Sequence, residues 1–477
     1  MIQPLHLGLA VALLLTSCGE LIHNYRYSSS PRPEAKAGGG GAVAFAASAT
    51  RGTLLSIVQQ PVTTATLGGA VLLQRPHELL AGNLPDSSEF LYSPAQAPGT
   101  PGFEALLDRA RIPPPALAKL TWLVDGKSFF PEIERQIRNA RRSIDVQVYI
   151  FDNDDVAVRQ ADLLKQHSTT ADVRVLFDDL GSMTAAGKAP DTAPPPGFVA
   201  PRKMSKYLRD GSRIQVRSML NPWLVCDHTK LLVFDQNIAL MGCANIGREY
   251  LSEWHDLMFR VEGPAVALLQ DDYNRTWRRA APFALAGLFQ KNPAATPPSP
   301  APGAVAIRIL RTDPAAGRFE IRESMLLVIQ AARKRIWIED PYVAHDDITE
   351  ALKDAARRGV DVRLIYPGQN DSKIMDTSNR AFADELVKAG GKAYVYPRMT
   401  HLKVMICDDW ACVGSANMDT LSMRINRELN ITVSAPIEIT KLVNQIFLPD
   451  FRVSKRHSTV DSSPPAAGLA EAVADQL

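Results

Sequence analysis

Between residues 119 and 455, short apolar runs rich in β-branched residues alternate with stretches whose apolar residues recur at helical spacing. In the first half the pattern predicts helices at 133–140 and 156–166 and strands at 144–150, 173–177 and 214–216. In the second half it predicts helices at 319–332, 348–358 and 382–389 and strands at 336–338, 360–365 and 392–396. Strands that alternate with helices favour an α/β fold. We therefore expect an α/β protein with two similar lobes, each a mixed β-sheet flanked by helices.

The same polar motif follows the strands of each half: His-x-Lys, four residues, Asp, a short turn and Gly-x-x-Asn. The two copies are His228, Lys230, Asp235 and Asn245, then His401, Lys403, Asp408 and Asn417. An acid follows each copy eleven residues after its Asn, at Asp256 and Glu428. Strand alternation places the His and Lys of each copy on one face. A single His-x-Lys carries little weight, but two copies that agree at six positions indicate a functional site.

Length and charge limit the class of protein. A chain of 477 residues is long enough for more than one domain-sized core. The formal net charge is only +2, whereas a protein that neutralises many phosphates usually carries a concentrated basic excess. We therefore expect no nucleic-acid partner.

Four of the five cysteines lie inside the motifs: Cys226, Cys243, Cys407 and Cys412. This placement makes a poor disulfide framework and favours ordinary core thiols. A bridge between Cys407 and Cys412, which flank a predicted turn, stays open as an alternative. No spacing of His and Cys suits zinc, and we expect no metal or other cofactor.

The first residues predict a location. Residues 5–16 form a largely apolar run. Its length suits the core of a signal peptide and is too short to span a bilayer as a helix. Leu15-Thr16-Ser17-Cys18 resembles a bacterial lipobox, although the residues before the apolar run include no Lys or Arg. The interpretation is a lipoprotein held to a membrane of the bacterial cell envelope through Cys18. A plain buried or membrane-associated apolar segment is the alternative.

The predicted organisation has six parts. Residues 1–18 form the signal, 19–115 a tether and a region without assigned chemistry, 116–290 the first lobe, 291–303 a Pro-rich linker, 304–456 the second lobe, and 457–477 a disordered tail. The Ala- and Pro-rich insertion at 185–201 is expected to be a surface loop near the site entrance. Aromatic and basic residues at 273–289 allow either a membrane-facing surface or a packing helix with a solvated basic edge.

Further residues around the motifs carry a family resemblance. They are Asn245-Ile246-Gly247-Arg248-Glu249-Tyr250, Trp254-His255-Asp256 and Gly414-Ser415-Ala416-Asn417-Met418-Asp419. With the two motifs, they make residues 119–455 resemble the phospholipase D superfamily, nearest its bacterial cardiolipin synthase-like branch. Three positions depart from the family pattern: Asp227 replaces a basic residue before the first His, Cys243 replaces a Ser, and Leu421 replaces a common Arg. The catalytic His and Lys are intact.

The chemistry of a phosphodiester explains these residue types. Cleavage needs cations around the phosphate, a nucleophile and an acid for the departing oxygen. Lys230 and Lys403 are predicted to act as fixed charges on the phosphate, with Asn245, Asn417 and Ser415 as further substrate contacts. One His attacks phosphorus and the other protonates the leaving alcohol. The resemblance favours His228 as the nucleophile.

The acids have an expected use in orienting the catalytic histidines. A catalytic His is held in one tautomer by a partner on its other ring nitrogen. We expect Asp256 to orient His228 and Glu428 to orient His401. Asp235 and Asp408 are either catalytic or only pin a turn at the strand end.

The resemblance implies a phosphatidyltransferase or phosphodiesterase that acts on phospholipids through a phosphohistidine, most like a cardiolipin synthase. The acceptor would be an alcohol or water. Three alternatives stay open: hydrolysis of phospholipid to phosphatidic acid, a secreted nuclease, and a lipid-binding envelope protein. Because both motifs lie in one chain, we expect one active site at the lobe interface of a monomer.

Overall fold

A computed structural model describes residues 64, 94–178, 181–182, 185, 190–220, 225–281 and 295–458. Cys18, the tether, residues 283–289 and the tail beyond 458 lie outside the described residues. No helix in the described ranges is long and apolar enough to cross a membrane.

In the described part of the first lobe there are seven strands, which are β1 (Ala116–Val124), β2 (Ser143–Val148), β3 (Asp172–Asp178), β4 (Gln215–Met219), β5 (Leu231–Phe234), β6 (Ile238–Gly242) and β7 (Leu257–Glu262). Its main helices are α6 (Gly126–Asn139), α7 (Asp155–His167), α9 (Met204–Arg209) and α10 (Ala265–Arg279). Strands β2, β3 and β4 are parallel, and the others pair antiparallel.

The second lobe repeats this arrangement. Its strands are β8 (Val305–Asp313), the short β9 (Arg318–Phe319), β10 (Arg335–Glu339), β11 (Asp361–Pro367), β12 (Lys392–Tyr396), β13 (Val404–Cys407), β14 (Trp410–Gly414), β15 (Glu428–Val433) and β16 (Lys455–Arg456). Its helices include α12 (Glu320–Ala331), α13 (Asp346–Arg357), α14 (Lys373–Lys388), α15 (Pro436–Leu442) and α16 (Leu448–Val453).

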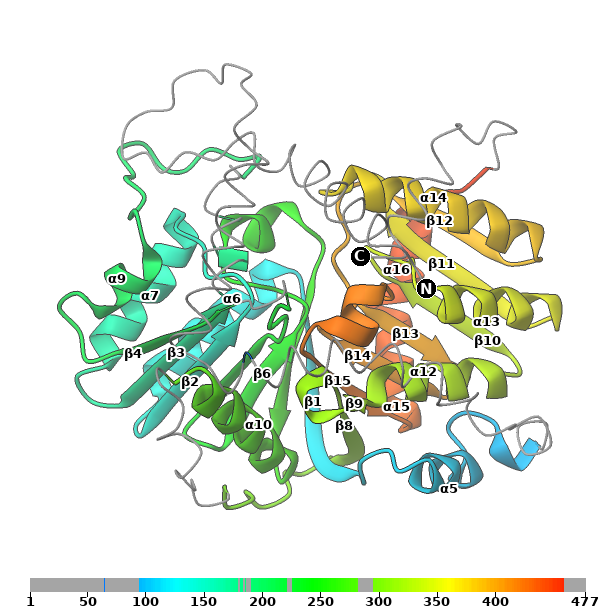
Figure 1. Cartoon of the computed structure of the whole chain (residues 1–477), viewed down its shortest axis with the longest axis horizontal. Helices are drawn as coiled ribbons and strands as arrows, with labels where there is room; N and C mark the ends of the chain where they lie inside the picture. Colours follow the sequence, from blue (N-terminus) through cyan, green and yellow to red (C-terminus); the bar gives the residue numbers. More distant parts are fainter. Residues whose placement is uncertain are drawn as a thin grey trace.

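The sheets of the two lobes are joined edge to edge. From the junction outwards, the first lobe runs β1-β7-β6-β5-β2-β3-β4 and the second runs β8-β15-β14-β13-β10-β11-β12, so the strand orders are equivalent. Strands β1 and β8 pair antiparallel over residues 116–118 and 305–307. Figure 1 shows the first lobe in cyan and green and the second in yellow and orange, with β1 and β8 between them. The expected α/β architecture of two mixed sheets is confirmed, and the sheets form one continuous layer.

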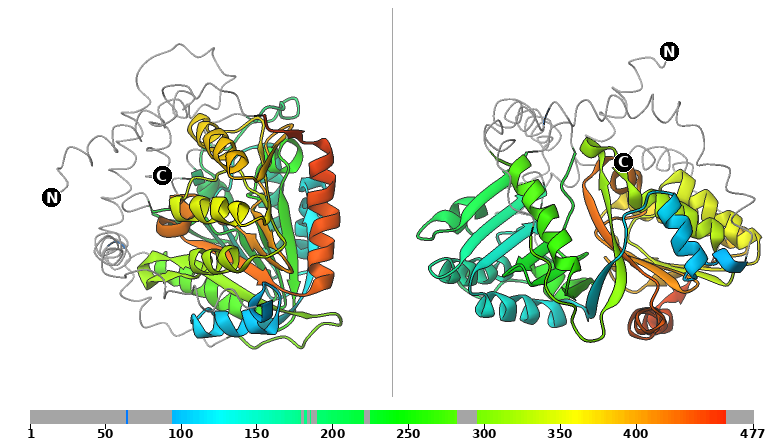
Figure 2. Two further views of the ribbon diagram at one scale, coloured as in Figure 1. Left: turned by 90° about the vertical axis from the view of Figure 1, so that its right-hand side faces the viewer. Right: turned by 90° about the horizontal axis from the view of Figure 1, so that it is seen from below.

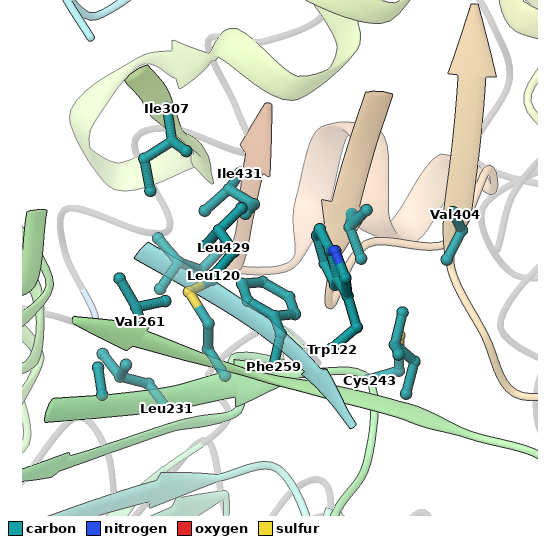
Figure 3. Packing of buried hydrophobic residues seen from close by; sticks show 14 of the residues in the cluster. Leu120, Trp122, Leu231, Cys243, Phe259, Val261, Ile307, Val404, Leu429 and Ile431 are labelled. Atoms are coloured by element: carbon teal, nitrogen blue, oxygen red, sulfur yellow. The ribbon is translucent and has the colours of Figure 1, made fainter. Parts of the chain in front are cut away.

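The helices cover the sheet on both faces (Figure 2). One apolar cluster runs across the junction and joins residues of both lobes, including Leu120, Phe259, Ile307 and Leu429 (Figure 3). Separate clusters lie under α6 and α7 in the first lobe and under α12 and α13 in the second. Burial of apolar surface across the junction holds the lobes together.

The helix at 265–279 decides one open alternative. In α10, Tyr273 is fully buried and Trp277 is 6% exposed, and both pack into the cluster at the junction. The membrane-facing interpretation is therefore wrong for these two residues, and the described part of the segment is a packing helix.

Two helix starts were missed from the sequence. Helix α6 begins at Gly126 rather than 133, because Pro131 reads as a breaker although the helix accommodates it in its second turn. Helix α14 begins at Lys373 rather than 382, after an N-cap in which the Ser372 hydroxyl accepts from the Met375 N–H.

The region before the first lobe contributes to the second. Helix α5 (Pro101–Arg109) buries Phe103 and Leu107 in the apolar cluster of the second lobe. Arg308 of β8 forms ion pairs with Glu104 and Asp108 of this helix at 2.8 Å each. The end of the region without assigned chemistry is therefore part of the folded body.

Candidate active site

Each His-Lys pair stands just before a buried strand in the middle of its lobe's sheet. His228 and Lys230 precede β5, and His401 and Lys403 precede β13, and the exposed fractions of these four residues are 1–9%. A glycine closes the following strand in each copy because the neighbouring backbone approaches closely. A Cβ on Gly242 would lie 2.4 Å from the Leu257 carbonyl oxygen, and one on Gly414 would lie 2.5 Å from that of Leu429. This explains the Gly of Gly-x-x-Asn.

In each copy of the motif, a short π-helix lies between the Asn and the acid. These are η3 (Glu249–Glu253) and η5 (Leu421–Ile425), at equivalent places in the two lobes. Wide helical turns of this kind are frequent at functional sites. After each π-helix the backbone contacts the opposite lobe, so that the two segments cross over between the lobes. The His401 N–H donates to the His255 carbonyl at 2.7 Å, and the His228 N–H donates to the Arg427 carbonyl at 2.9 Å.

This crossing reverses the expected pairing of acids and histidines. His228 Nδ1 lies 3.0 and 3.1 Å from the two carboxylate oxygens of Glu428, and His401 Nδ1 lies 2.9 Å from Asp256 Oδ2. The prediction that Asp256 orients His228 and Glu428 orients His401 was therefore wrong. The reason is that the residue before each acid pairs in parallel with the residue before the opposite histidine, as Asp227 with Arg427 and His255 with Thr400.

The environment favours neutral histidines with a free Nε2. Burial lowers the pKa of His228 and of His401 well below the usual range, and the positive charges of both lysines lower each pKa further. A carboxylate accepts, so the contact with Glu428 or Asp256 keeps the ring proton on Nδ1. Each Nε2 then carries a lone pair for attack on phosphorus or for proton transfer.

The two lysines supply the positive charge. Lys230 Nζ donates to the His228 carbonyl at 2.7 Å, and Lys403 Nζ donates to the His401 carbonyl at 2.8 Å. Within the described residues this is the one hydrogen bond of each ammonium, so two N–H donors of each remain for an anion. Burial lowers the pKa of Lys230 to about 7, against the opposing charge of Glu428.

The two acids differ in their donors. Glu428 accepts from the hydroxyls of Ser415, at 2.6 Å, and Ser422, at 2.8 Å. Asp256 accepts from the Leu257 N–H at 2.8 Å. Burial raises the pKa of both carboxyls to about 7. Ser415 was predicted to contact substrate, but its hydroxyl donates to the orienting acid instead.

The substitution of Cys243 for Ser removes the equivalent donor from the first copy. The Cys243 thiol donates to the Gly414 carbonyl at 3.1 Å and accepts from the Lys403 N–H at 3.3 Å, so it links the lobes. Burial raises its pKa to about 12. The prediction of core thiols is confirmed for Cys243, Cys407 and Cys412, which are buried and form no disulfide, whereas Cys226 is a partly exposed thiol.

The two motif asparagines are buried beside the histidines. Asn245 Nδ2 donates to the Tyr250 hydroxyl at 3.0 Å, and its Oδ1 accepts from the Ile150 N–H at 3.0 Å. Asn417 Oδ1 has no partner among the described residues. The Asn245 amide is held at both ends, and the open oxygen of Asn417 can accept a hydrogen bond from a ligand hydroxyl.

Asp235 and Asp408 lie away from the histidines, at the far ends of β5 and β13. Four residues of extended chain lie between each of them and the motif lysine, so the Cα atoms are five steps or roughly 16 Å apart. The Asp235 carboxylate accepts from the N–H groups of residues 141–143, and Asp408 accepts from those of residues 333–335, at 2.7–3.1 Å. Both have positive φ, of 53° and 50°. These contacts support the turn-pinning alternative.

Asp235→Ala is expected to destabilise the first lobe without slowing the folded enzyme. Three backbone N–H groups lose their acceptor, which costs roughly 2 kcal/mol. Urea unfolding measures the loss, and Asp409→Ala, an exposed residue of the equivalent turn, is the matched control with an effect within about 0.5 kcal/mol. A tenfold fall in the kcat of folded Asp235→Ala would instead support the catalytic alternative.

Aromatic rings around the histidines were not predicted as site residues. The Tyr149 ring lies 4.8 Å from the His228 ring, and the Trp254 and Tyr250 rings lie 5.2 and 5.8 Å from that of His401. Ser422 was also missed. Ser422 lies five residues after Asn417, and Tyr250 lies five residues after Asn245. This shared offset from the motif Asn could have marked both Ser422 and Tyr250 as site residues.

The insertion at 185–201 contacts the segment just before Trp254. In its described part, the N–H groups of Asp191 and Thr192 donate to the Glu253 carboxylate at 3.0 and 2.8 Å. Glu253 directly precedes Trp254, so this loop is tied to the segment that delivers Asp256.

Among the described residues, two groups of side chains have the spacing of metal ligands, and neither includes a catalytic His, Lys or orienting acid. They are His255 with Glu339 and Asp450, and Asp152 with Asp154 and Glu249. In the first group both imidazole nitrogens are already engaged, with Asp125 Oδ1 at 2.7 Å and Asp450 Oδ2 at 3.2 Å. Both ring nitrogens of His255 therefore face carboxylates rather than an open site.

A known protein family matches both lobes of the chain. The family described as cardiolipin synthase, phospholipase D-like domain, matches residues 133–277 and 325–450, which include all ten predicted catalytic residues. The chain belongs to this family.

Two relatives of the cardiolipin synthase family illustrate the match. The chain is 31% identical to cardiolipin synthase 1 of Bacillus anthracis over 71% of its own length and 66% of the relative's. It is 30% identical to cardiolipin synthase A of Pseudomonas aeruginosa over 76% of its length and 74% of the relative's. A phosphatidylserine synthase structure from Haemophilus influenzae aligns with a TM-score of 0.62 over 78% of this chain and 99% of that one, at 14% identity, which shows a shared fold.

Proposed function

We propose that the chain transfers a phosphatidyl group from one phospholipid to an alcohol, through a phosphohistidine on His228, in the manner of a cardiolipin synthase. The observation that carries this proposal is the pair of buried histidines, each hydrogen-bonded at Nδ1 to an acid from the opposite lobe. The buried lysines beside them provide the positive charge that a phosphodiester requires.

In the first step, His228 Nε2 attacks phosphorus and the bond from phosphorus to the headgroup oxygen breaks. His401 donates a proton to that oxygen, and the headgroup leaves as an alcohol. The low pKa of His401 in the empty site rises when the anionic phosphate offsets the charges of the two lysines. Substrate binding therefore prepares the acid.

In the second step, His401 takes the proton from an incoming alcohol. The alcohol oxygen attacks phosphorus and the bond to His228 Nε2 breaks, which restores the enzyme. With phosphatidylglycerol as donor and acceptor, the products are cardiolipin and glycerol. Water in place of the alcohol yields phosphatidic acid.

Labelled phosphatidylglycerol in mixed micelles tests this function. Release of glycerol with formation of labelled cardiolipin is the expected result. Phosphatidic acid as the sole labelled product would make the enzyme a hydrolase. Turnover of single-stranded DNA without turnover of lipid would overturn the lipid substrate.

The dependence of kcat/KM on pH is expected to be a narrow bell near neutrality. Glu428 and Asp256 must be ionised, and their raised pKa values, about 7, make activity fall as the pH drops below 7. Lys230 must be protonated, and its lowered pKa, about 7, makes activity fall as the pH rises above 7. Bound phosphate stabilises the charged lysine, so the alkaline limb of kcat lies at higher pH. An alkaline limb of kcat/KM above pH 9 would contradict the low pKa of Lys230.

We also propose that Cys18 carries a lipid anchor, which rests on the lipobox-like sequence alone. Cys18→Ser is expected to release the catalytic lobes from the membrane fraction in an active form. Cell fractionation with a detergent-phase partition measures this. Unchanged partitioning of the variant would remove the anchor from the proposal.

A further inference from the structure

The residue directly before each orienting acid is a buried basic side chain that reaches the opposite lobe. Arg427, from the second lobe, contacts two acids of the first: Nη1 lies 3.4 Å from Asp227 Oδ1, and Nη2 donates to Asp272 Oδ2. His255, from the first lobe, contacts Asp450 of the second at 3.2 Å. Both side chains are less than 8% exposed.

Each of these basic residues is linked through the backbone to the acid that follows it and to the histidine that this acid contacts. The Arg427 carbonyl accepts from the His228 N–H, and the next residue, Glu428, reaches the His228 ring. The His255 carbonyl accepts from the His401 N–H, and the next residue, Asp256, reaches the His401 ring. One basic residue, one acid and one catalytic histidine therefore form a unit at each of two equivalent places.

We propose that Arg427 and His255 are positioning residues, each of which anchors its segment in the opposite lobe and thereby fixes the following acid against the catalytic histidine. The proposal rests on the proposed function, because it assigns a role in the same two-histidine reaction. It also gives a role to Asp227, one of the three residues that depart from the family pattern, as an ionic partner of Arg427.

The acidic groups around His255 keep its imidazole positively charged. Asp125, Glu339 and Asp450 face it, from the start of α6, from β10 and from α16, and the Tyr396 ring of β12 stacks on it at 4.9 Å. Arg398 faces Asp125 at 3.7 Å. Burial alone would lower the pKa of His255, but the hydrogen bonds to Asp125 and Asp450 raise it to about 10. His255 is therefore a cation at neutral pH.

Asp125, which contacts His255, has an unfavourable backbone conformation. Its φ of 63° and ψ of 156° are a conformation that L residues rarely adopt. In that conformation its carboxylate accepts from both His255 Nδ1, at 2.7 Å, and the Asp256 N–H, at 3.2 Å. Such strain persists where the surrounding contacts over-determine the residue. The strained residue thus holds the positioning residue and its acid together.

The two units are expected to act on different steps. The charge of His255 lowers the pKa of Asp256, so His255→Gln should raise that pKa and move the acid limb for natural lipid to higher pH. A rise of about one unit would leave roughly a tenth of Asp256 ionised at pH 7 in the free enzyme and reduce kcat/KM about fivefold there. His255→Arg keeps the positive charge and should hold the limb at its wild-type position.

The Arg427 unit should affect formation of the phosphohistidine, because it positions the acid behind His228. Arg427→Lys keeps one charge but cannot span Asp227 and Asp272 together. It is expected to slow the burst with an activated phosphodiester, bis(4-nitrophenyl) phosphate, by about tenfold without moving the acid limb. Arg427→Gln should slow the burst further.

The experiment compares these four variants with the wild-type full chain, after circular dichroism and urea unfolding have shown that each is folded. If His255→Gln does not fold, His255→Arg alone still tests the role of charge, because a limb displaced in this variant contradicts it. An unchanged limb in folded His255→Gln, or a wild-type burst rate in folded Arg427→Lys, would overturn the proposal. A wild type that forms phosphohistidine but no cardiolipin would overturn the proposed function and leave the positioning roles standing.

Discussion

His228→Ala is expected to abolish the covalent intermediate on every substrate, whereas His401→Ala is expected to retain it on an activated one. The difference follows from the division of labour: the first histidine forms the bond to phosphorus, and the second only protonates the leaving oxygen. General acid help is worth roughly a hundred- to ten-thousand-fold, and a nitrophenolate leaving group does not need it. On natural lipid both variants should fall by at least that factor.

Acid-quench mass spectrometry of the peptides around the two histidines measures the intermediate directly. Both rings are buried, so each variant needs an unfolding curve, and the exposed-turn variant Asp409→Ala serves as the active control. Label on His401 of the wild type would reverse the two roles. A fully active enzyme that carries label on neither residue would overturn the covalent mechanism.

The sequence predicted the repeated lobes because their determinants are local. Parallel strands such as β2 and β10 are almost completely buried, so they appear as apolar runs, and the paired motifs mark equivalent places in both halves. Helix starts were harder to predict. Pro131 conceals the first turns of α6, and the helical pattern alone placed the start of α14 at 382, nine residues after its observed start at Lys373.

The sequence also identified the site residues, but not which acid serves which histidine. Asp256 follows Asn245 by a short, fixed offset, and proximity in sequence suggested a partner in the same copy. The partner of His401 is nevertheless Asp256, 145 positions away, and that of His228 is Glu428, 200 positions away. Two identical offsets are equally compatible with straight and crossed pairing, because a symmetric repeat has no preference between them. The contacts between the lobes decide it.

The crossed pairing predicts which single substitutions imitate each other. Glu428→Gln should behave like His228→Ala, because Gln can donate to Nδ1 and so favours the tautomer that has lost its lone pair on Nε2. The comparable substitution in a serine protease triad lowers kcat about 10⁴-fold. We expect a loss of that order in phosphohistidine formation, even with bis(4-nitrophenyl) phosphate.

Asp256→Asn should instead behave like His401→Ala. It disturbs the acid for the leaving group, so turnover of natural lipid should fall by a factor of roughly a hundred to ten thousand. With the activated phosphodiester the burst of nitrophenolate and the label on His228 should remain. Straight pairing predicts the opposite, since Asp256→Asn would then remove the nucleophile and Glu428→Gln would spare it.

The comparison is controlled within the chain. Both substitutions are nearly isosteric and both remove a buried carboxylate, so the two variants lose a similar electrostatic contribution. Ser415→Ala is the matched control for Glu428, because it removes one hydroxyl donor and leaves the carboxylate on His228. It should lower the burst rate by about tenfold, the effect of one hydrogen bond to a charged group. Burst amplitudes that follow Asp256 rather than Glu428 would show that the lobes pair straight in the working enzyme.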